Sequence, residues 1–303
     1  MRAVGPRLRR GRAWSRPMSR PDIFVKGRVG IVGVGEMGRP ILNRLKARGF
    51  DVSAYVRRDE VKAELDAMGV TLEPDVKALG KGRDFIISYV LTDAQTRQVA
   101  LDDGLIDSMD PGSILIIHTT GSMKTVQEIG ERGAARGVKV VDAGGAWPPP
   151  YTALGEMTLM VGGEPEDVAR CMPVMETYAY PIHHMGPLGS GMALKLINNA
   201  VAGVHFQVAS EVIRISRDLG LDAFRVLRCL TYATGGSTAM HLMCGATTEE
   251  RFWESSGYFL YKDLTVVYEA AEQMGLDLGM IGELNKRLME HISTTRADRP
   301  ACT

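Results

Sequence analysis

Residues 28–38 read RVGIVGVGEMG, an apolar β-branched run that leads directly into a glycine turn. The glycines follow the pattern G-x-G-x-x-G, and residues 36–48 show helical spacing. Between a strand and a helix this pattern predicts a dinucleotide-binding turn, in which the first glycine permits the turn, the second admits a pyrophosphate and the third allows close packing. The first N–H groups of the helix also attract phosphate. We therefore expect the cofactor to contact Gly33, Gly35, Glu36, Met37 and Gly38.

Around this turn the chain alternates short apolar runs with amphipathic stretches up to about residue 182. The apolar runs are typical of buried parallel strands and cover residues 28–34, 51–56, 84–90, 113–118 and 139–142. Helical spacing is found at residues 36–48, 60–68, 94–100 and 123–136. Alternating strands and helices predict an α/β Rossmann domain, which has a doubly wound, mostly parallel sheet.

The pattern changes after a glycine-rich, hinge-like stretch at residues 186–191. Helical stretches follow at residues 192–219, 223–232, 259–274 and 280–292, without a strand pattern among them. A chain of 303 residues exceeds the size of a typical single core. We predict a basic, disordered tail at 1–26, a Rossmann domain at 27–187 and an all-α domain for substrate binding and dimerisation at 188–303.

Composition argues against several classes of protein. Lys plus Arg and Asp plus Glu both number 36, so the total charge does not favour binding to nucleic acid or an anionic membrane. No apolar run approaches the roughly 18 residues of a membrane span. The cysteines are scattered, which predicts reduced thiols, no metal site and a cytoplasmic protein; they are Cys171, Cys229, Cys244 and Cys302.

The first 26 residues are unusual because they hold seven arginines and a single acid, Asp22. An Arg-rich, acid-poor start is also found in organelle transit peptides. The alternatives are a disordered tail or a true start at Met18, and we favour these two. A nucleic-acid-binding arm is disfavoured because no DNA-binding module follows it.

The end of the second predicted strand bears on the choice of cofactor. NAD-binding proteins place a carboxylate there to bind the ribose 2′-hydroxyl, whereas this chain has Arg57 and Arg58. Two guanidiniums fit a 2′-phosphate better than a hydroxyl, so we expect NADP(H) rather than NAD(H). Two solvated surface arginines are the alternative, which predicts no preference. Val90 and Leu91, at the end of a later strand, are expected to line the adenosine side.

Four separated blocks in the chain together resemble the β-hydroxyacid dehydrogenase family. This family includes 3-hydroxyisobutyrate and tartronate semialdehyde reductases and is related to 6-phosphogluconate dehydrogenase. The resemblance covers residues 28–292, and its blocks are the glycine turn, Thr119-Thr120, residues 186–199 (GPLGSGMALKLINN) and Lys262-Asp263. It implies that Thr120 lies beside the nicotinamide and the substrate and that Lys262 lies near the cofactor or the substrate. It also implies pairing through the helical domain, as a homodimer or a dimer of dimers.

Within the third block, Lys195 and Asn199 are four residues apart and share one helical face. A lysine in a dry cleft can have its pKa lowered toward neutrality, which suits it to donate and accept a proton. We expect Lys195 to be the catalytic proton donor and acceptor. Asn199 is expected to hold the substrate oxygen or to orient the lysine.

One segment departs from the family pattern. Where the family has D-A-P-V-S-G-G in the substrate loop, residues 142–148 read DAGGAWP. Ala146 takes the place of the serine, Trp147 is bulky, and Pro148 has no N–H to donate. We predict a larger, more apolar or aromatic substrate, or one that carries its anion elsewhere, with Ala146 and Trp147 at the pocket wall. A merely stiff loop at residues 147–150 is the alternative.

These observations predict an oxidoreductase that transfers hydride between NADP(H) and a small-molecule carbonyl or hydroxyl substrate. An imine reductase on the same fold is one alternative. The other is a dinucleotide-binding interaction module without catalysis, which the presence of Lys195, Asn199 and Lys262 disfavours.

Overall fold

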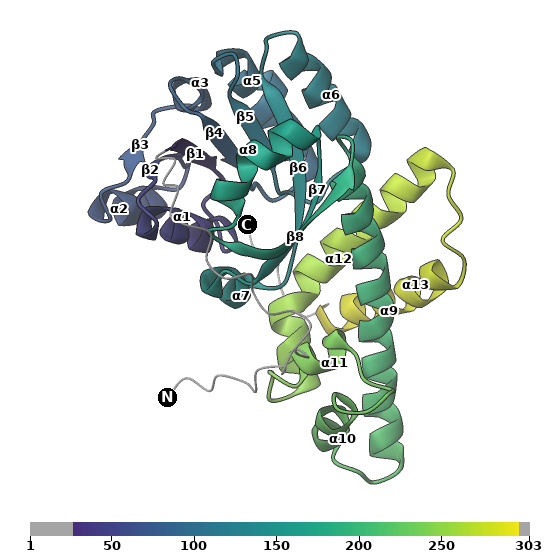
Figure 1. Cartoon of the computed structure of the whole chain (residues 1–303). Helices are drawn as coiled ribbons and strands as arrows, with labels where there is room; N and C mark the ends of the chain where they lie inside the picture. The colour runs from purple at the N-terminus through teal and green to yellow at the C-terminus, as the bar shows by residue number, and fades with distance from the viewer. Residues whose placement is uncertain (1–26, 297–303) are drawn as a thin grey trace. The chain divides into compact units, whose positions relative to one another are not determined.

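The computed structural model describes residues 27–296 of the chain. The predictions for residues 1–26 and Cys302 lie outside these residues. In the described part, alternating strands and helices come first and a series of helices follows (Figure 1). This order confirms the predicted fold class, a mostly parallel α/β sheet followed by an all-helical region.

Within the described residues an eight-stranded sheet has the strand order β3-β2-β1-β4-β5-β6-β7-β8. Neighbouring strands are parallel except for β6 and β7, which are antiparallel. The strands are β1 (Arg28–Val32), β2 (Asp51–Tyr55), β3 (Thr71–Leu72), β4 (Phe85–Ser88), β5 (Ile114–Ile117), β6 (Lys139–Ala146), β7 (Met157–Gly162) and β8 (Ala179–Gly186).

Helices connect these strands and cover both faces of the sheet. They are α1 (Gly38–Ala47), α2 (Asp59–Ala67), α3 (Val76–Gly80), α4 (Asp93–Arg97), the π-helical η2 (Gln98–Asp102), α5 (Leu105–Ser108), α6 (Met123–Ala134), α7 (Pro149–Leu154) and α8 (Pro165–Met175). Because side chains alternate along a strand, Ile116 packs in one core with α1, α2 and α8, whereas its neighbour Leu115 packs in another with α3, α5 and α6. Burial on both faces explains why the strands read as continuous apolar runs.

The prediction for the end of β6 was wrong. The predicted strand stopped at Asp142, but β6 continues to Ala146, so most of the segment predicted as a substrate loop is strand. Ala143, Gly144 and Gly145 have low strand propensity, and antiparallel pairing with β7 overrides it. Strands β3 and β7 were also not predicted.

The helices after β8 are α9 (Ser190–Asp218), α10 (Ala223–Leu230), α11 (Thr238–Met243), α12 (Glu249–Met274) and α13 (Gly279–Arg296). Helix α12 begins ten residues before its predicted start at 259. These helices enclose a core of their own, with Phe206, Ile213 and Trp253 among its buried members. No helix within residues 27–296 has the length and apolar content needed to cross a membrane.

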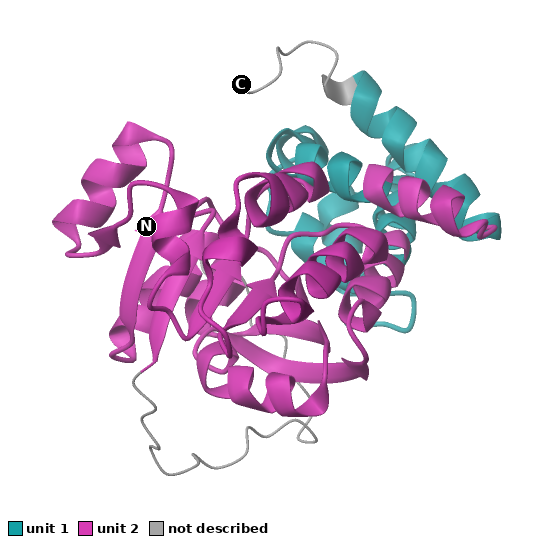
Figure 2. Ribbon diagram, turned by 90° about the horizontal axis from the view of Figure 1, so that it is seen from above, with its two compact units in different colours: residues 1–25, 201–264, 278–303 teal, residues 26–200, 265–277 magenta. Residues whose placement is uncertain are grey.

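The contacts within the chain define two compact units, which Figure 2 shows in different colours. Among the described residues, the α/β unit contains residues 27–200 and Thr265–Asp277, and the helical unit contains Val201–Leu264 and residues 278–296. The division falls inside α9, whereas the predicted domain boundary lies near its start. Lys195 and Asn199 therefore belong to the α/β unit. The domain limits of 27–187 and 188–303 remain a prediction.

Candidate functional site

The three glycines of the turn differ in their surroundings. Gly33 has a φ of 92°, and a Cβ there would overlap the backbone of Tyr89. A Cβ on Gly38 would overlap the carbonyl oxygen of Gly33. Gly35 has nothing within 4 Å of its Cβ position. The outer glycines thus permit close packing, and the middle one faces open space, which suits the approach of a pyrophosphate.

The start of α1 can receive an anion. Its N-cap residue, Met37, makes no side-chain hydrogen bond to the helix, and the first turn contains no acid. Free N–H groups at a helix start carry a partial positive charge that favours phosphate. The exposed Glu36 and the half-buried Met37 lie in this turn, as predicted contacts of the cofactor. The residues present therefore fit the phosphates of a dinucleotide.

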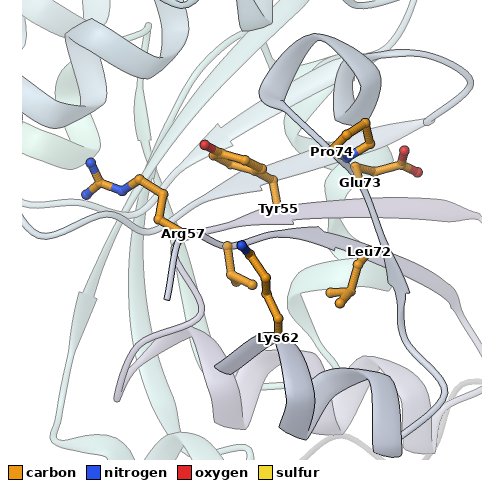
Figure 3. Close-up of a pocket in the computed structure, with 7 residues that line it drawn as sticks. Tyr55, Arg57, Lys62, Leu72, Glu73 and Pro74 are labelled. Atoms are coloured by element: carbon orange, nitrogen blue, oxygen red, sulfur yellow. The ribbon is translucent and has the colours of Figure 1, made fainter. Parts of the chain in front are cut away.

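A pocket of about 470 Å³ lies at the carboxyl end of β2 (Figure 3). It is lined by Tyr55, Val56, Arg57, Lys62, Leu72, Glu73 and Pro74. Its basic groups come from the strand end and from α2, and Lys62 Nζ lies 2.7 Å from Asp59 Oδ1. The carboxylate of Glu73 is neutralised by Arg83, with 2.6 Å between the charged atoms. With Lys62 and Glu73 each paired to an opposite charge, Arg57 gives the lining a net positive charge, which favours an anionic group.

The two predicted arginines differ in position. Arg57 lines the pocket, whereas the exposed Arg58 is the N-cap residue of α2 and is absent from the lining. Sequence reasoning missed Lys62 and Tyr55. Lys62 lies four residues after Arg58 on a helix, so the helical spacing at residues 60–68 was a usable signal for it.

The carboxyl edge of β4 and β5 holds the next group of predicted residues. The hydroxyl of Thr119 donates a hydrogen bond of 2.9 Å to the carbonyl of Val90, which joins the ends of the two strands. Thr120 is buried, Val90 is half-buried, and Leu91 is exposed. The N–H of Gly121 points to the sulfur of Met192 at 3.4 Å, so the segment that carries Thr120 lies against the first turn of α9.

Lys195 and Asn199 are both buried on α9, with 8% and 7% of their surfaces exposed. The stem of Lys195 crosses β6 at Gly144, where an added Cβ would lie 2.6 Å from the lysine Cβ and 3.0 Å from its Cγ. Only a glycine lets the lysine stem approach the strand so closely. The structure thus brings Lys195, on α9, against the segment that was predicted to bind substrate.

Asp142, which sequence reasoning did not select, holds the start of α9. Its carboxylate is fully buried and accepts hydrogen bonds from the N–H groups of Gly189 at 2.7 Å and Met192 at 2.5 Å. A Cβ on Gly162 or Gly191 would collide with this carboxylate or its neighbouring backbone. Burial raises the pKa of Asp142, and the backbone N–H groups act in the opposite direction. Asp142 and Gly144 lie on the same face of β6 and together set the position of the lysine helix.

Ala146 ends β6, and Trp147 follows it in a backbone conformation that L-residues rarely adopt, with a φ of 91°. The Trp147 ring lies against that of Tyr151, with 4.6 Å between the centroids and 32° between the planes. The prolines at Pro148 and Pro149 start α7, which carries Tyr151. Residues 147–151 therefore form an aromatic pair directly after the end of β6.

Lys262 lies on α12 in the helical unit, with its Nζ 2.9 Å from Asp263 Oδ1. The expected contact of Lys262 with the cofactor or the substrate remains a prediction. Among residues 27–296, no group of three or more His, Cys, Asp and Glu side chains is arranged to hold a metal ion.

Comparisons with known proteins match this architecture. Residues 28–186 match the NAD binding domain of 6-phosphogluconate dehydrogenase, and residues 189–299 match the NAD-binding domain of NADP-dependent 3-hydroxyisobutyrate dehydrogenase. An oxidoreductase of Mycobacterium tuberculosis without an assigned reaction is 30% identical over 217 residues, which cover 70% of this chain and 73% of the relative.

Two further comparisons agree with these matches. The L-threonate dehydrogenase of Cupriavidus necator is 28% identical over 269 residues, which cover 86% of this chain and 89% of the relative. A solved structure of M. tuberculosis 3-hydroxyisobutyrate dehydrogenase with L-serine superimposes with a TM-score of 0.78 over 90% of this chain and 94% of that chain. Its sequence identity is 23%, so it bears on the fold alone.

Proposed function

Because the chain belongs to the 3-hydroxyisobutyrate dehydrogenase-like family of NAD(P)-dependent dehydrogenases, we propose that it transfers hydride between NADP(H) and a carbonyl or hydroxyl substrate, with Lys195 as the proton donor and acceptor. The observation that carries this proposal is the burial of Lys195 against Gly144 of β6. A buried amine beside β6, the strand that we propose to border the substrate, can exchange a proton with a substrate oxygen without competition from bulk water.

The roles of the other residues follow from their positions. The bound nicotinamide supplies the hydride or receives it. Lys195 protonates the carbonyl oxygen during reduction and removes the hydroxyl proton during oxidation. Asn199, one turn later on the same face of α9, donates its amide N–H to the same oxygen. Thr120 orients the substrate from the carboxyl edge of β5.

The decisive experiment replaces Lys195 with alanine. Positioned proton transfer contributes about 10²–10⁴-fold to a rate, so Lys195→Ala should lose about that much kcat while its Kd for NADPH stays unchanged. Lys124→Ala, at an exposed position of α6, is the control and should keep full turnover. Equal kcat for Lys195→Ala and wild type would refute the proposal, and no turnover in the wild type would favour an interaction module.

We also propose that the cofactor is NADP(H), bound with its 2′-phosphate in the pocket of Arg57 and Lys62. Both cationic side chains line the same pocket; Glu73 is paired with Arg83, and the exposed Lys62–Asp59 pair leaves the Lys62 ammonium at the pocket wall, where a phosphate can compete for it. Arg57→Ala and Lys62→Ala should each lower the ratio of kcat/KM for NADPH to that for NADH. Arg58→Ala should have a smaller effect because Arg58 does not line the pocket. An unchanged ratio in the Arg57→Ala, Lys62→Ala double variant would leave NADP(H) preference without support.

The substrate, in this proposal, is larger or more apolar than a small aliphatic hydroxy acid. Ala146 has no hydroxyl to bind a carboxylate, and the Trp147–Tyr151 pair offers an aromatic wall. Turnover should be measured for 3-hydroxyisobutyrate, for aryl-substituted 3-hydroxy acids and aldehydes, and for cyclic imines. A higher kcat/KM for the aryl compounds is expected, and a lower one would contradict this part of the proposal. Faster turnover of the imines would identify an imine reductase.

Finally, we propose that the protein forms a homodimer or a dimer of dimers through its helical unit. Helix α9, together with Leu219 directly after its last residue, exposes an apolar stripe in which 41% of the surface of Val208, 47% of Ile215 and 68% of Leu219 is accessible. The spacing of seven and four residues places all three on one side of the helix. Such a stripe is typical of a surface that another helix covers.

A further inference from the structure

His118, at the carboxyl end of β5, is fully buried and has a defined partner on each ring nitrogen. Its Nδ1 lies 2.6 Å from the carbonyl oxygen of Ala143, and its Nε2 lies 3.0 Å from the hydroxyl of Tyr178. A carbonyl can only accept, so Nδ1 carries the proton and donates to Ala143. The Tyr178 hydroxyl donates to Nε2. These two bonds assign the neutral Nδ1–H tautomer.

The hydrogen bond to Ala143 continues the sheet beyond its last backbone pairing. The ladder between β5 and β6 ends at Ile117 and Asp142. Ala143 is the next residue of β6 and is fully buried, and the imidazole of His118 supplies a donor to its carbonyl. Thr119 does the same on the other side of β5, where its hydroxyl bonds to Val90. Two successive side chains therefore join the end of β5 to both neighbouring strands, immediately before Thr120.

The surroundings of His118 favour its neutral form. The tyrosine rings of Tyr89 and Tyr178 lie 5.3 Å and 5.6 Å from the imidazole, and Cys171 lies near Tyr178. Burial lowers the pKa of His118 to about 4 and raises the pKa of Cys171 to about 12, so this cluster is uncharged at neutral pH. Asp142, the adjacent residue of β6, directs its carboxylate to the start of α9.

We propose that His118 is a positioning residue for the reaction, because its Nδ1–H fixes Ala143 and hence the adjacent Gly144 against which Lys195 packs. This inference rests on the proposed role of Lys195. The bond holds β6 from the side of β5, and Asp142 ties the same part of β6 to α9. Loss of the Nδ1 donor lets the strand and the lysine shift together, and a displacement of about 1 Å can cost roughly 10²-fold in rate.

Two substitutions separate the two ring nitrogens. His118→Asn places an amide N–H near the position of Nδ1 and keeps the donor to Ala143, while it loses the acceptor for Tyr178. His118→Gln places its amide near Nε2 and loses the donor to Ala143. We expect kcat to fall by about tenfold or more in His118→Gln and to recover most of the wild-type value in His118→Asn, with the Kd for NADPH unchanged in both.

A purely structural role would give a different result. Val174→Ala removes buried side-chain volume from α8, in the same core as Tyr178. As a control, this variant should have a lower free energy of unfolding and a normal kcat. Equal kcat losses in His118→Asn and His118→Gln, or a matching loss in Val174→Ala, would overturn the proposal.

Hydrogen–deuterium exchange gives a readout that needs no substrate, so it separates this inference from the proposed function. His118→Gln should accelerate amide exchange in residues 142–146 and at the start of α9, whereas His118→Asn and Val174→Ala should not. Unchanged exchange in His118→Gln would exclude the positioning role even if Lys195 proves to be catalytic. If the wild type shows no turnover but His118→Gln still accelerates exchange, the restraint on β6 is retained and only the proposed reaction is refuted.

Discussion

At the scale of single residues, no heavy atom of the described chain lies within 4 Å of the Cβ position of Gly35. That space is where a pyrophosphate must approach the backbone if the turn binds a dinucleotide. Gly35→Ala should therefore leave the free energy of unfolding within about 0.5 kcal/mol of wild type, as for a surface substitution. It should weaken NADPH binding by about tenfold or more, because the new methyl group excludes the phosphates.

The matched variant is Gly33→Ala, where a positive φ and the backbone of Tyr89 both oppose a side chain. It should lower stability as well as cofactor binding. Urea unfolding and NADPH fluorescence titration measure the two effects. If Gly35→Ala bound NADPH as tightly as wild type, the pyrophosphate would have to lie elsewhere.

His118 contributes a pH dependence of stability at the same scale. Its folded-state pKa of about 4 lies below the ordinary value of 6.5, because burial disfavours the charged ring. Only the unfolded chain takes up this proton between those values, so stability is fully present above pH 6.5 and is lost as the pH falls toward 4. At about 1.4 kcal/mol per pKa unit, the loss is about 3 kcal/mol.

Unfolding free energies of wild type and His118→Asn, measured by urea denaturation from pH 7 to pH 4, test this prediction. The variant should lack the part of the decline that begins near pH 6.5. Parallel curves for the two proteins over this range would show that His118 is not held in its neutral form.

At the scale of elements, the start of α9 depends on Asp142. The carboxylate accepts two backbone hydrogen bonds there, and Asp142→Asn replaces one acceptor oxygen with an amide that cannot accept. We expect a loss of about 1.5–3 kcal/mol in unfolding free energy, as for hydrogen bonds to a charged group. A fall in kcat should accompany it because α9 carries Lys195.

Asp75→Asn is the matched control, since Asp75 is an exposed N-cap residue that accepts from Ala78 N at 2.8 Å in α3. It should cost about 1 kcal/mol or less and leave kcat unchanged. A cost for Asp142→Asn no greater than for Asp75→Asn, together with normal kcat, would show that Asp142 does not set the position of α9.

At the scale of the whole molecule, the apolar stripe on α9 bears on assembly. A charge at Ile215 would be costly in an interface and neutral on a free surface. Ile215→Glu should therefore shift the protein from dimer or tetramer to monomer at micromolar concentration in light scattering after size exclusion. Leu276→Glu, at a position of which 56% is exposed outside this stripe, should leave the assembly unchanged. A monomeric wild type would refute the assembly proposal.

Local sequence patterns were sufficient to predict much of the fold and part of the candidate site. The glycine turn, the alternation of strands and helices, and the placement of Lys195 and Asn199 on one helical face depend on residues that are close in sequence. Steric limits on φ and the periods of strand and helix act over a few residues, so these features could be predicted without tertiary information.

Tertiary structure alone decided how the site is assembled. It extended β6 through Ala146, and it brought Asp142 to amides 47 and 50 residues away and His118 to a tyrosine 60 residues away. Lys62 and Tyr55 likewise became neighbours in one pocket only when α2 packed beside β2. Sequence spacing carries no signal for such pairs, because their approach depends on how several elements pack. It also depends on glycines such as Gly144, whose missing side chain matters only because another segment of the chain crosses the strand there.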